Sequence, residues 1–250
     1  MKFECTEVWG FTHALRGMRN PKESWNKSDT KGKVFCDDFL NIVTTVEQIG
    51  TADLQLAQSL IRAGSEHRKF MRQIFVSVDI TAPLYWWKEF DTYKVGTVAN
   101  STSTMHKLAS TPITKECFEM DDFENISYEV FETGVEFEGF KELADYKVDY
   151  TWNGTLDCLE KLRQKYNETK DKRYWKELIR LLPESWLQKR TVTMNYENLL
   201  GMCSKGQRRF HKLTEWSDSF ITWVRGLPYA QELIFIDEVG NGKEKSNNEN

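Results

Sequence analysis

The chain has 250 residues, of which 40% are hydrophobic and 29% are charged, and its formal net charge at pH 7 is −4. This composition is typical of a folded globular protein and argues against wholesale disorder. The negative net charge argues against a protein that binds nucleic acid through its phosphates regardless of sequence.

Cysteine and histidine usage and the apolar runs argue against further classes of protein. The five cysteines include no CxxC pair and the four histidines show no metal-ligand spacing, so neither a disulfide scaffold nor a metal site is expected. No apolar run approaches the roughly 18 residues of a membrane span, and no apolar leader follows Met1. We therefore expect no membrane partner and a cytoplasmic location.

The N-terminal segment is expected to form a strand, a short helix and a loop. Residues 3–10 are expected to be the strand, 13–21 the helix or turn, and the polar stretch 22–33 the loop. Arg16 and Arg19 stand three residues apart, so they would share a face of a helix. They are either two solvated arginines or a clamp for a phosphate.

The next elements are expected to be helices followed by a strand. Residues 38–48 are expected to be helical, although their β-branched residues weaken that prediction. A helix is expected over 51–63, with Thr51 able to cap its start and Gly64 suited to the position after its end. Alternating β-branched residues over 73–80 predict a strand.

Residues 82–106 (APLYWWKEFDTYKVGTVANSTSTMH) combine aromatic, amide and hydroxyl side chains directly after that strand. A helix is expected to end near Tyr93, and Gly96 indicates a turn. Aromatic rings can stack on a flat ligand, and hydroxyls can hydrogen-bond a phosphate. The segment is therefore the candidate ligand site. The alternatives are an aromatic core and a hydroxyl-rich turn with local backbone bonds.

The second half is expected to be mainly helical around one more strand. The acidic and aromatic stretch 117–139 has no clean period, and we expect an insert of about residues 110–150 to form a variable excursion or a surface layer. Helices are expected over about 155–168 and 172–182, and Pro183 marks the end of the second.

The C-terminal part is expected to continue with a strand and two helices. Residues 188–195 alternate as a strand does, a helix is expected from about Tyr196, and another is expected over 214–225. Residues 240–250 form a polar tail that is expected to be disordered.

The segment LLPESWLQKRTVTMNYENLL at 181–200 combines a helix stop, a fixed gap and a switch from strand to helix. With Leu182-Pro183-Glu184 and Val192-Thr193-Met194-Asn195 at matching separation, it resembles the C-terminal core of the flavin-dependent thymidylate synthases (ThyX). The order of Gly64-Ser65-Glu66-His67, strand, helix and the run 94–106 is similar to the N-terminal half of that family. The blocks DITAPLYWWKEFDTYKVGT and HKLTEW resemble a divergent branch, often encoded by bacteriophages, which would place the protein in a host cell.

The chain departs from the family at its signature, which begins Arg-His-Arg. Depending on the alignment, Asp91-Thr92-Tyr93 or Lys94-Val95-Gly96 stands there instead. Ile179 stands where the family has an arginine before Leu-Pro, and Arg180 is its neighbour. In the family, the Arg-His-Arg groups contact the flavin and its partners. The departures therefore concern the family's chemistry more than its fold.

The resemblance implies an α+β fold. We expect a single domain over 1–239 with a central, mostly antiparallel sheet flanked by helices. The resemblance also implies FAD as cofactor, methylene-tetrahydrofolate and NADPH as co-substrates, and methylation of dUMP or a related one-carbon transfer to a pyrimidine. Reduced flavin carries the redox step in such enzymes, so no protein nucleophile is required. The family also implies a homotetramer with sites built between subunits.

Two sets of candidate residues follow from the resemblance and the residue types, and no catalytic residue is assigned. The pyrimidine nucleotide and its phosphate would be held by Lys94, Asn100, Ser101, Ser103, Thr104, Arg180 and Arg190. The cofactor would be held by Ser65, Glu66, His67, Trp86, Tyr93, His106 and Asn195.

Two other functions stay open at this point. One is a non-catalytic module on the same scaffold that binds a nucleotide or another protein, and the loss of Arg-His-Arg favours it. The other is a structural phage protein without a small ligand.

Overall fold

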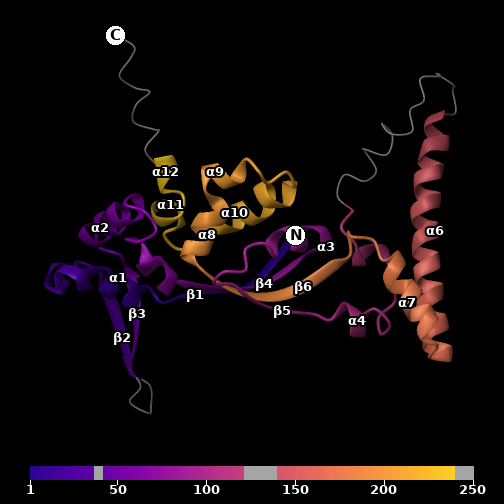
Figure 1. The fold of residues 1–250 in the computed structure, drawn as a ribbon, viewed down its shortest axis with the longest axis horizontal. Coiled ribbons are helices and arrows are strands. Elements are labelled where there is room, and N and C mark those ends of the chain that lie inside the picture. The colour runs from indigo at the N-terminus through magenta and orange to yellow at the C-terminus, as the bar shows by residue number, and fades with distance from the viewer. Residues whose placement is uncertain (37–41, 121–139, 240–250) are drawn as a thin grey trace, which may run out of the picture. The chain divides into compact units, whose positions relative to one another are not determined.

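The computed structural model describes residues 1–36, 42–120 and 140–239 (Figure 1). The chain forms two compact units: unit 1 is Met1–Ile80, Glu89–Asn100 and Arg190–Asn250, and unit 2 is Thr81–Lys88 and Ser101–Lys189. The single domain predicted over 1–239 is therefore not confirmed. The predicted tail 240–250 and the central part of the predicted insert, 121–139, lie outside the described residues.

A four-stranded sheet in the order β1-β4-β6-β5 lies mainly in unit 1. Its strands are β1 (Lys2–Trp9), β4 (Phe75–Pro83), β5 (Val98–Ser101) and β6 (Leu187–Asn195). Strands β4 and β6 run antiparallel, because Ser77 Oγ lies 2.6 Å from Thr193 Oγ1 and Thr191 Oγ1 donates to Asp79 Oδ1 at 2.6 Å. The strands predicted over 3–10, 73–80 and 188–195 are confirmed.

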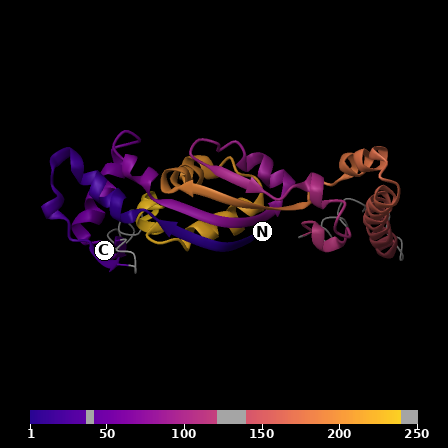
Figure 2. The same cartoon turned by 90° about the horizontal axis from the view of Figure 1, so that it is seen from below.

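Seven α-helices are described in unit 1, and those near the C-terminus cover one face of the sheet (Figures 1 and 2). They are α1 (Phe11–Arg19), α2 (Thr51–Arg62), α8 (Tyr196–Cys203), α9 (Lys205–Arg208), α10 (Ile221–Arg225), α11 (Ala230–Leu233) and α12 (Ile236–Val239). Helix α10 contacts the sheet through Trp223, whose ring stacks on Phe3 of β1 with centroids 4.9 Å apart.

Short irregular helices complete unit 1. Three 3-10 helices span Asn20–Lys22, Trp25–Lys27 and Lys69–Gln73, and a π-helical turn spans Glu215–Phe220. The helix predicted over 214–225 is thus a π-helical turn followed by α10. Trp216 and Phe220 are buried in this turn, with ring centroids 5.1 Å apart.

The helix predicted over 38–48 is wrong for residues 42–48, and residues 38–41 lie outside the described part of the chain. Residues 42–48 form strand β3 (Ile42–Gln48), which pairs antiparallel with β2 (Lys31–Cys36), placing Phe35 opposite Val43. Five consecutive β-branched residues begin at Ile42, and such side chains lose rotamer freedom in a helix but suit a strand.

Helix α2 matches the predicted helix, but a different residue caps it. The position before the helix is Gly50, which has no side chain to serve as a cap. The carboxylate of Asp29 instead accepts the amides of Ala52 at 2.8 Å and Asp53 at 3.1 Å. Thr51 is therefore not the cap. Gly64 has the positive φ, 106°, that suits the position after a helix end.

Unit 2 is mainly helical and has a core of its own. Its described helices are most of α3 (Leu84–Phe90), α4 (Thr104–Lys107), a 3-10 helix (Lys115–Cys117), α6 (Phe140–Thr169) and α7 (Lys172–Leu181). The core consists of Leu108, Ile113, Phe118, Leu159 and Leu178. Helix α6 begins fifteen residues before the predicted start at 155, whereas α7 matches its prediction.

The N-terminal edge of the predicted insert belongs to the core of unit 2. Phe118 is buried, forms a β-bridge with Trp186, and packs edge-on against Trp152 at 5.1 Å. Ile113 is buried in the same core. A surface layer is therefore the wrong description of Phe118, because burial of its ring is what anchors this segment.

Glu160 on α6 and its neighbour Arg163 bind the backbone of the segment that contains Ala109 and Ile113. Its carboxylate accepts the amide of Ile113 at 2.9 Å and hydrogen bonds from Arg163 at 2.7 and 2.5 Å. Arg163 in turn donates to the carbonyl of Ala109 at 3.2 Å. The hydrogen bond with Arg163 is the largest of the effects that lower the pKa of Glu160 to about 2.

We expect Glu160→Gln to lower the free energy of unfolding by about 1.5–3 kcal/mol, because hydrogen bonds to a charged group are lost. A carboxylate with a lowered pKa stabilises the fold above its unfolded value of about 4.3, and the gain disappears as pH falls toward 2. Urea unfolding at pH 7 and at steps down to pH 2 measures both effects. Asp157→Asn, in an exposed pair with Lys161, is the control and should cost under about 1 kcal/mol; equal losses in both variants would contradict the prediction.

Within the described part of the chain, no helix is both long enough and apolar enough to cross a membrane.

Candidate functional site

The predicted nucleotide-binding residues are divided between the two units. Unit 1 contains Lys94, Asn100 and Arg190, and unit 2 contains Ser101, Ser103, Thr104 and Arg180. Their surroundings decide which of them remain available to a ligand.

Lys94, Asn100 and Ser101 are available. All three are exposed, and among the described residues none of their side chains has a hydrogen bond or an ion pair. Asn100 and Ser101 end strand β5, whose four residues are all exposed. A phosphate can accept hydrogen bonds from an ammonium, an amide or a hydroxyl group. The edge of a base can both donate to and accept from an amide or a hydroxyl.

Ser103 and Thr104 already have structural roles. The hydroxyl of Ser103 accepts the amide of His106 at 3.2 Å and so caps the short helix α4. Thr104 Oγ1 accepts from the amide of Gln188 at 3.2 Å, and the same amide group donates to the carbonyl of Thr102 at 3.0 Å. Ser103 therefore matches the alternative of local backbone bonds, whereas the partner of Thr104 is a side chain 84 residues away in sequence.

The two predicted arginines are both paired with carboxylates. Arg190 donates to Asp91 Oδ1 at 2.8 Å, and only 15% of its side chain is exposed. Arg180 lies on the surface of α7 and pairs with Glu177 at 3.0 Å. A phosphate would have to compete with these carboxylates for either guanidinium group.

Among the predicted cofactor residues, the turn after α2 is open to solvent. Ser65, Glu66 and His67 are all exposed, and the amide of His67 donates to the carbonyl of Gly64 at 3.0 Å. Glu66 has a neighbouring cation in Lys69 at 3.5 Å. The Ser65 hydroxyl and the His67 imidazole remain available. His106, in unit 2, is also exposed.

Trp86 and Asn195 do not have the surroundings predicted for cofactor contacts. Trp86 is fully buried and packs edge-on against Trp87, with centroids 4.9 Å apart, so it offers no exposed ring face. The side chain of Asn195 accepts the amide of Asn198 at 3.0 Å, and Asn198 accepts the amide of Asn195 at 3.1 Å. These reciprocal bonds form a capping box for α8.

Tyr93 belongs to a cluster that sequence reasoning missed. Its hydroxyl accepts from Gln207 at 2.6 Å and lies 3.3 Å from His211 Nε2. The His211 ring stacks on Trp216 at 4.1 Å, and its Nδ1 lies 2.8 Å from Glu89 Oε1. Burial is the main cause that raises the pKa of Tyr93, so the phenol stays protonated at neutral pH.

The signal for this cluster was the block HKLTEW, which brings His211 and Trp216 together. Sequence alone could not show that Glu89, 122 residues earlier, would orient the imidazole.

The turn after Tyr93 depends on Gly96. Its φ is +81°, and a Cβ there would lie 3.2 Å from side-chain atoms of Asn195 and Asn198. Asn198 also donates to the carbonyl of Val95 at 2.6 Å. The start of α8 therefore holds the turn that leads from Tyr93 and Lys94 into β5.

No three His, Cys, Asp or Glu side chains within the described ranges converge as a metal ion would require.

Comparison with solved structures finds the same fold in the flavin-dependent thymidylate synthase ThyX of Helicobacter pylori. One crystal structure of it, complexed with FAD and dUMP, is 15% identical to this chain with a TM-score of 0.56, and covers 95% of this chain and 99% of its own. A second, also with FAD and dUMP, is 16% identical with a TM-score of 0.57, and covers 95% and 98%. No protein-family profile and no curated protein matches the sequence. The likeness establishes a ThyX-like α+β fold.

Proposed function

We propose that this chain is a thymidylate synthase-like protein that binds a pyrimidine deoxynucleotide such as dUMP and uses FAD. The observation that supports this proposal is the ThyX-like fold over nearly the whole length of the chain, shared with an enzyme whose structures hold both molecules. The proposed reaction is methylation of dUMP, with methylene-tetrahydrofolate and NADPH as co-substrates. A homotetramer with sites between subunits is part of the same proposal.

The nucleotide proposal rests on the residues that are free to act. Lys94, Asn100 and Ser101 lie within eight consecutive residues and are exposed. The ammonium group of Lys94 would pair with the phosphate, while the amide and the hydroxyl would contact the phosphate or the base edge.

The available residues fit the polar parts of FAD better than its ring. Ser65, His67 and Tyr93 carry hydrogen-bonding groups on unit 1, whereas Trp86 has no face on which a flavin could stack. FAD, when bound, would supply the electron transfer that the protein side chains cannot. Ser65 and His67 would then bind its phosphate or ribityl groups, and Tyr93 would present a hydroxyl that Gln207 and His211 position.

The test of nucleotide binding is calorimetric titration of the purified protein with dUMP. We expect Lys94→Gln to weaken binding about tenfold, because one charge-assisted contact is lost, and Ser101→Ala to weaken it about fivefold. Lys176→Gln, which removes an exposed lysine from α7, is the control and should leave the affinity unchanged. Unchanged affinity in both Lys94→Gln and Ser101→Ala would remove this segment from the site.

The test of catalysis is the visible spectrum of the protein with added FAD, together with tritium release from labelled dUMP. A flavin absorption band and tritium release are the expected results. A colourless protein whose melting temperature rises with dUMP but not with FAD would overturn the proposed FAD-dependent activity.

A protein that is stabilised by dUMP but not by FAD would support the alternative function, a non-catalytic nucleotide-binding or protein-interaction module. The pair between Arg190 and Asp91 favours this alternative. Asp91 stands at the first position of the lost signature in one alignment, and its carboxylate neutralises a cation that could otherwise bind phosphate.

A further inference from the structure

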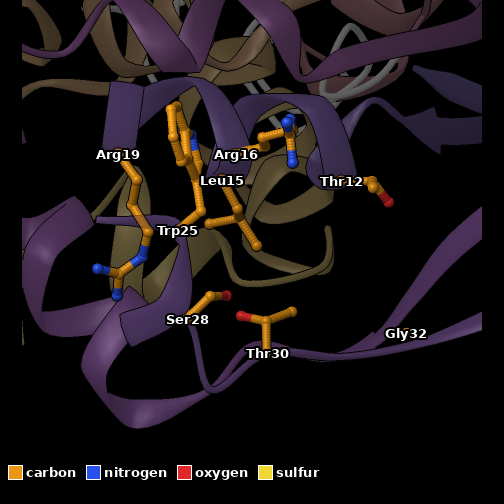
Figure 3. Close-up of a pocket in the computed structure, with 8 residues that line it drawn as sticks. All are labelled: Thr12, Leu15, Arg16, Arg19, Trp25, Ser28, Thr30 and Gly32. Atoms are coloured by element: carbon orange, nitrogen blue, oxygen red, sulfur yellow. The ribbon is translucent and has the colours of Figure 1, made fainter. Parts of the chain in front are cut away.

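A pocket of about 230 Å³ lies in unit 1 between helix α1, the segment after it and the start of β2 (Figure 3). Its lining residues are Thr12, Leu15, Arg16, Arg19, Trp25, Ser28, Thr30 and Gly32. None of them belongs to the two candidate sets for the nucleotide and the cofactor, although Arg16 and Arg19 are the pair that the sequence offered as a possible phosphate clamp.

In one part of the pocket, a cation lies over an aromatic ring. Trp25 is 40% exposed, which is unusual for so large an apolar side chain, and Asn20 accepts its indole N–H at 2.8 Å and so orients the ring. The guanidinium carbon of Arg16 lies 5.6 Å from the centre of this ring. Arg16 pairs with no carboxylate among the described residues, so its charge faces solvent.

The part of the pocket around Arg19 carries no net charge. Arg19 is 5% exposed and donates to Asp53 Oδ1 at 2.5 Å, so its charge is already compensated. The hydroxyls of Ser28 and Thr30 donate to the other carboxylate oxygen of Asp53. Figure 3 shows the side chains of Trp25 and Leu15 between the two guanidinium groups in that view. The one uncompensated charge of the lining is therefore that of Arg16.

We propose that this pocket binds a small aromatic anion, whose flat ring lies against Trp25 and Leu15 and whose carboxylate or phosphate pairs with Arg16. A ring stacked on an exposed indole gains apolar burial, and a bidentate contact to guanidinium suits either anionic group. The volume is below the 300–1,000 Å³ or so of pockets for drug-sized ligands. The pocket therefore fits one ring system with its anionic group and excludes a whole dinucleotide such as FAD.

The indole N–H signal of Trp25 tests this proposal in full-length protein labelled with nitrogen-15 at tryptophan. The signal is assigned by its loss in Trp25→Leu. We expect sodium benzoate to shift it saturably, benzamide to bind at least about fivefold more weakly, and sodium acetate to leave it in place. Titration with dCMP and with deoxycytidine asks whether a phosphate serves as well as a carboxylate.

Two controls separate the pocket from the rest of the surface. Arg16→Gln should weaken benzoate binding about tenfold, while Arg62→Gln, an exposed arginine on α2, should leave it unchanged. The Trp9 indole, also 40% exposed, should not shift. A Trp25 signal that ignores both benzoate and dCMP overturns the proposal, as does equal binding of benzoate and benzamide or an unchanged affinity in Arg16→Gln. The dUMP affinity is measured separately, so the two proposals can fail independently.

Discussion

Replacing Asp53 by alanine is expected to lower the free energy of unfolding by about 3–5 kcal/mol, the cost of leaving a buried charge without its partner. Asp53 is fully buried and Arg19 is 5% exposed, and the two side chains form an ion pair of 2.5 Å. Ser28 and Thr30 also donate to the carboxylate. Their hydrogen bonds would be lost together with the ion pair. Urea unfolding at fixed protein concentration measures the change.

The same carboxylate predicts how stability depends on pH. Burial raises the pKa of Asp53, but the hydrogen bonds from Ser28, Thr30 and Arg19 lower it by more, so the folded value lies below the ordinary one. A group with a lowered pKa stabilises the fold above its unfolded value of about 3.9, and this contribution disappears as pH falls through the folded value. The wild-type protein should therefore lose stability below about pH 4 more steeply than Asp53→Ala does.

Two further variants identify the cause. Arg19→Met combined with Asp53→Leu removes both charges and should recover most of the lost stability, because apolar side chains can replace a buried pair. Glu177→Gln breaks the exposed pair with Arg180 and should cost under about 1 kcal/mol. A loss in Asp53→Ala as small as that in Glu177→Gln would contradict the buried-charge explanation.

Replacing Gly10 by alanine is expected to lower the free energy of unfolding by about 2–5 kcal/mol, from backbone strain and overpacking together. Gly10 precedes α1 with a φ of +96°, and a Cβ there would lie 1.9 Å from the carbonyl oxygen of Gln73. That oxygen is backbone at the end of a 3-10 helix, so it cannot move aside as a flexible side chain could. Thermal and urea unfolding measure the loss.

Two other glycines are matched controls. Gly64 also has a positive φ, +106°, but no heavy atom lies within 4 Å of a Cβ there. Gly64→Ala therefore isolates the conformational cost of about 1–2 kcal/mol. Gly201 is helical with the same free space, so Gly201→Ala should raise stability by about 0.4–1 kcal/mol. If Gly10→Ala is no more destabilising than Gly64→Ala, the contact with Gln73 carries no cost.

Elements with a strong local pattern could be predicted from the sequence. The β-branched alternation that ends at Ile80 predicted β4, and Pro183 marked the end of the helix predicted over 172–182, which is α7. The helix predicted for residues 42–48 was wrong, although the five consecutive β-branched residues from Ile42 favour a strand locally. Pairing with β2, which local sequence does not reveal, decides the matter.

The candidate site could be predicted only in part, for the same reason. Residue type identified Lys94 and Ser101, which are exposed and available. It also identified Arg190 and Trp86, which the tertiary structure uses for an ion pair and for core packing. A guanidinium or an indole has the same chemistry in either role, so only its neighbours distinguish them.

By itself, the sequence determined the strands and helices with clear periodicity and the resemblance to a ThyX-like fold, because side-chain period and turn residues act over a few neighbouring positions. The tertiary structure alone decided which charged and polar groups are paired. Arg19 meets Asp53 across 34 residues, Arg190 meets Asp91 across 99, and Glu89 meets His211 across 122. Such partners are brought together by long-range packing, which in the described part of the chain leaves the side chains of Lys94, Ser101 and Arg16 exposed.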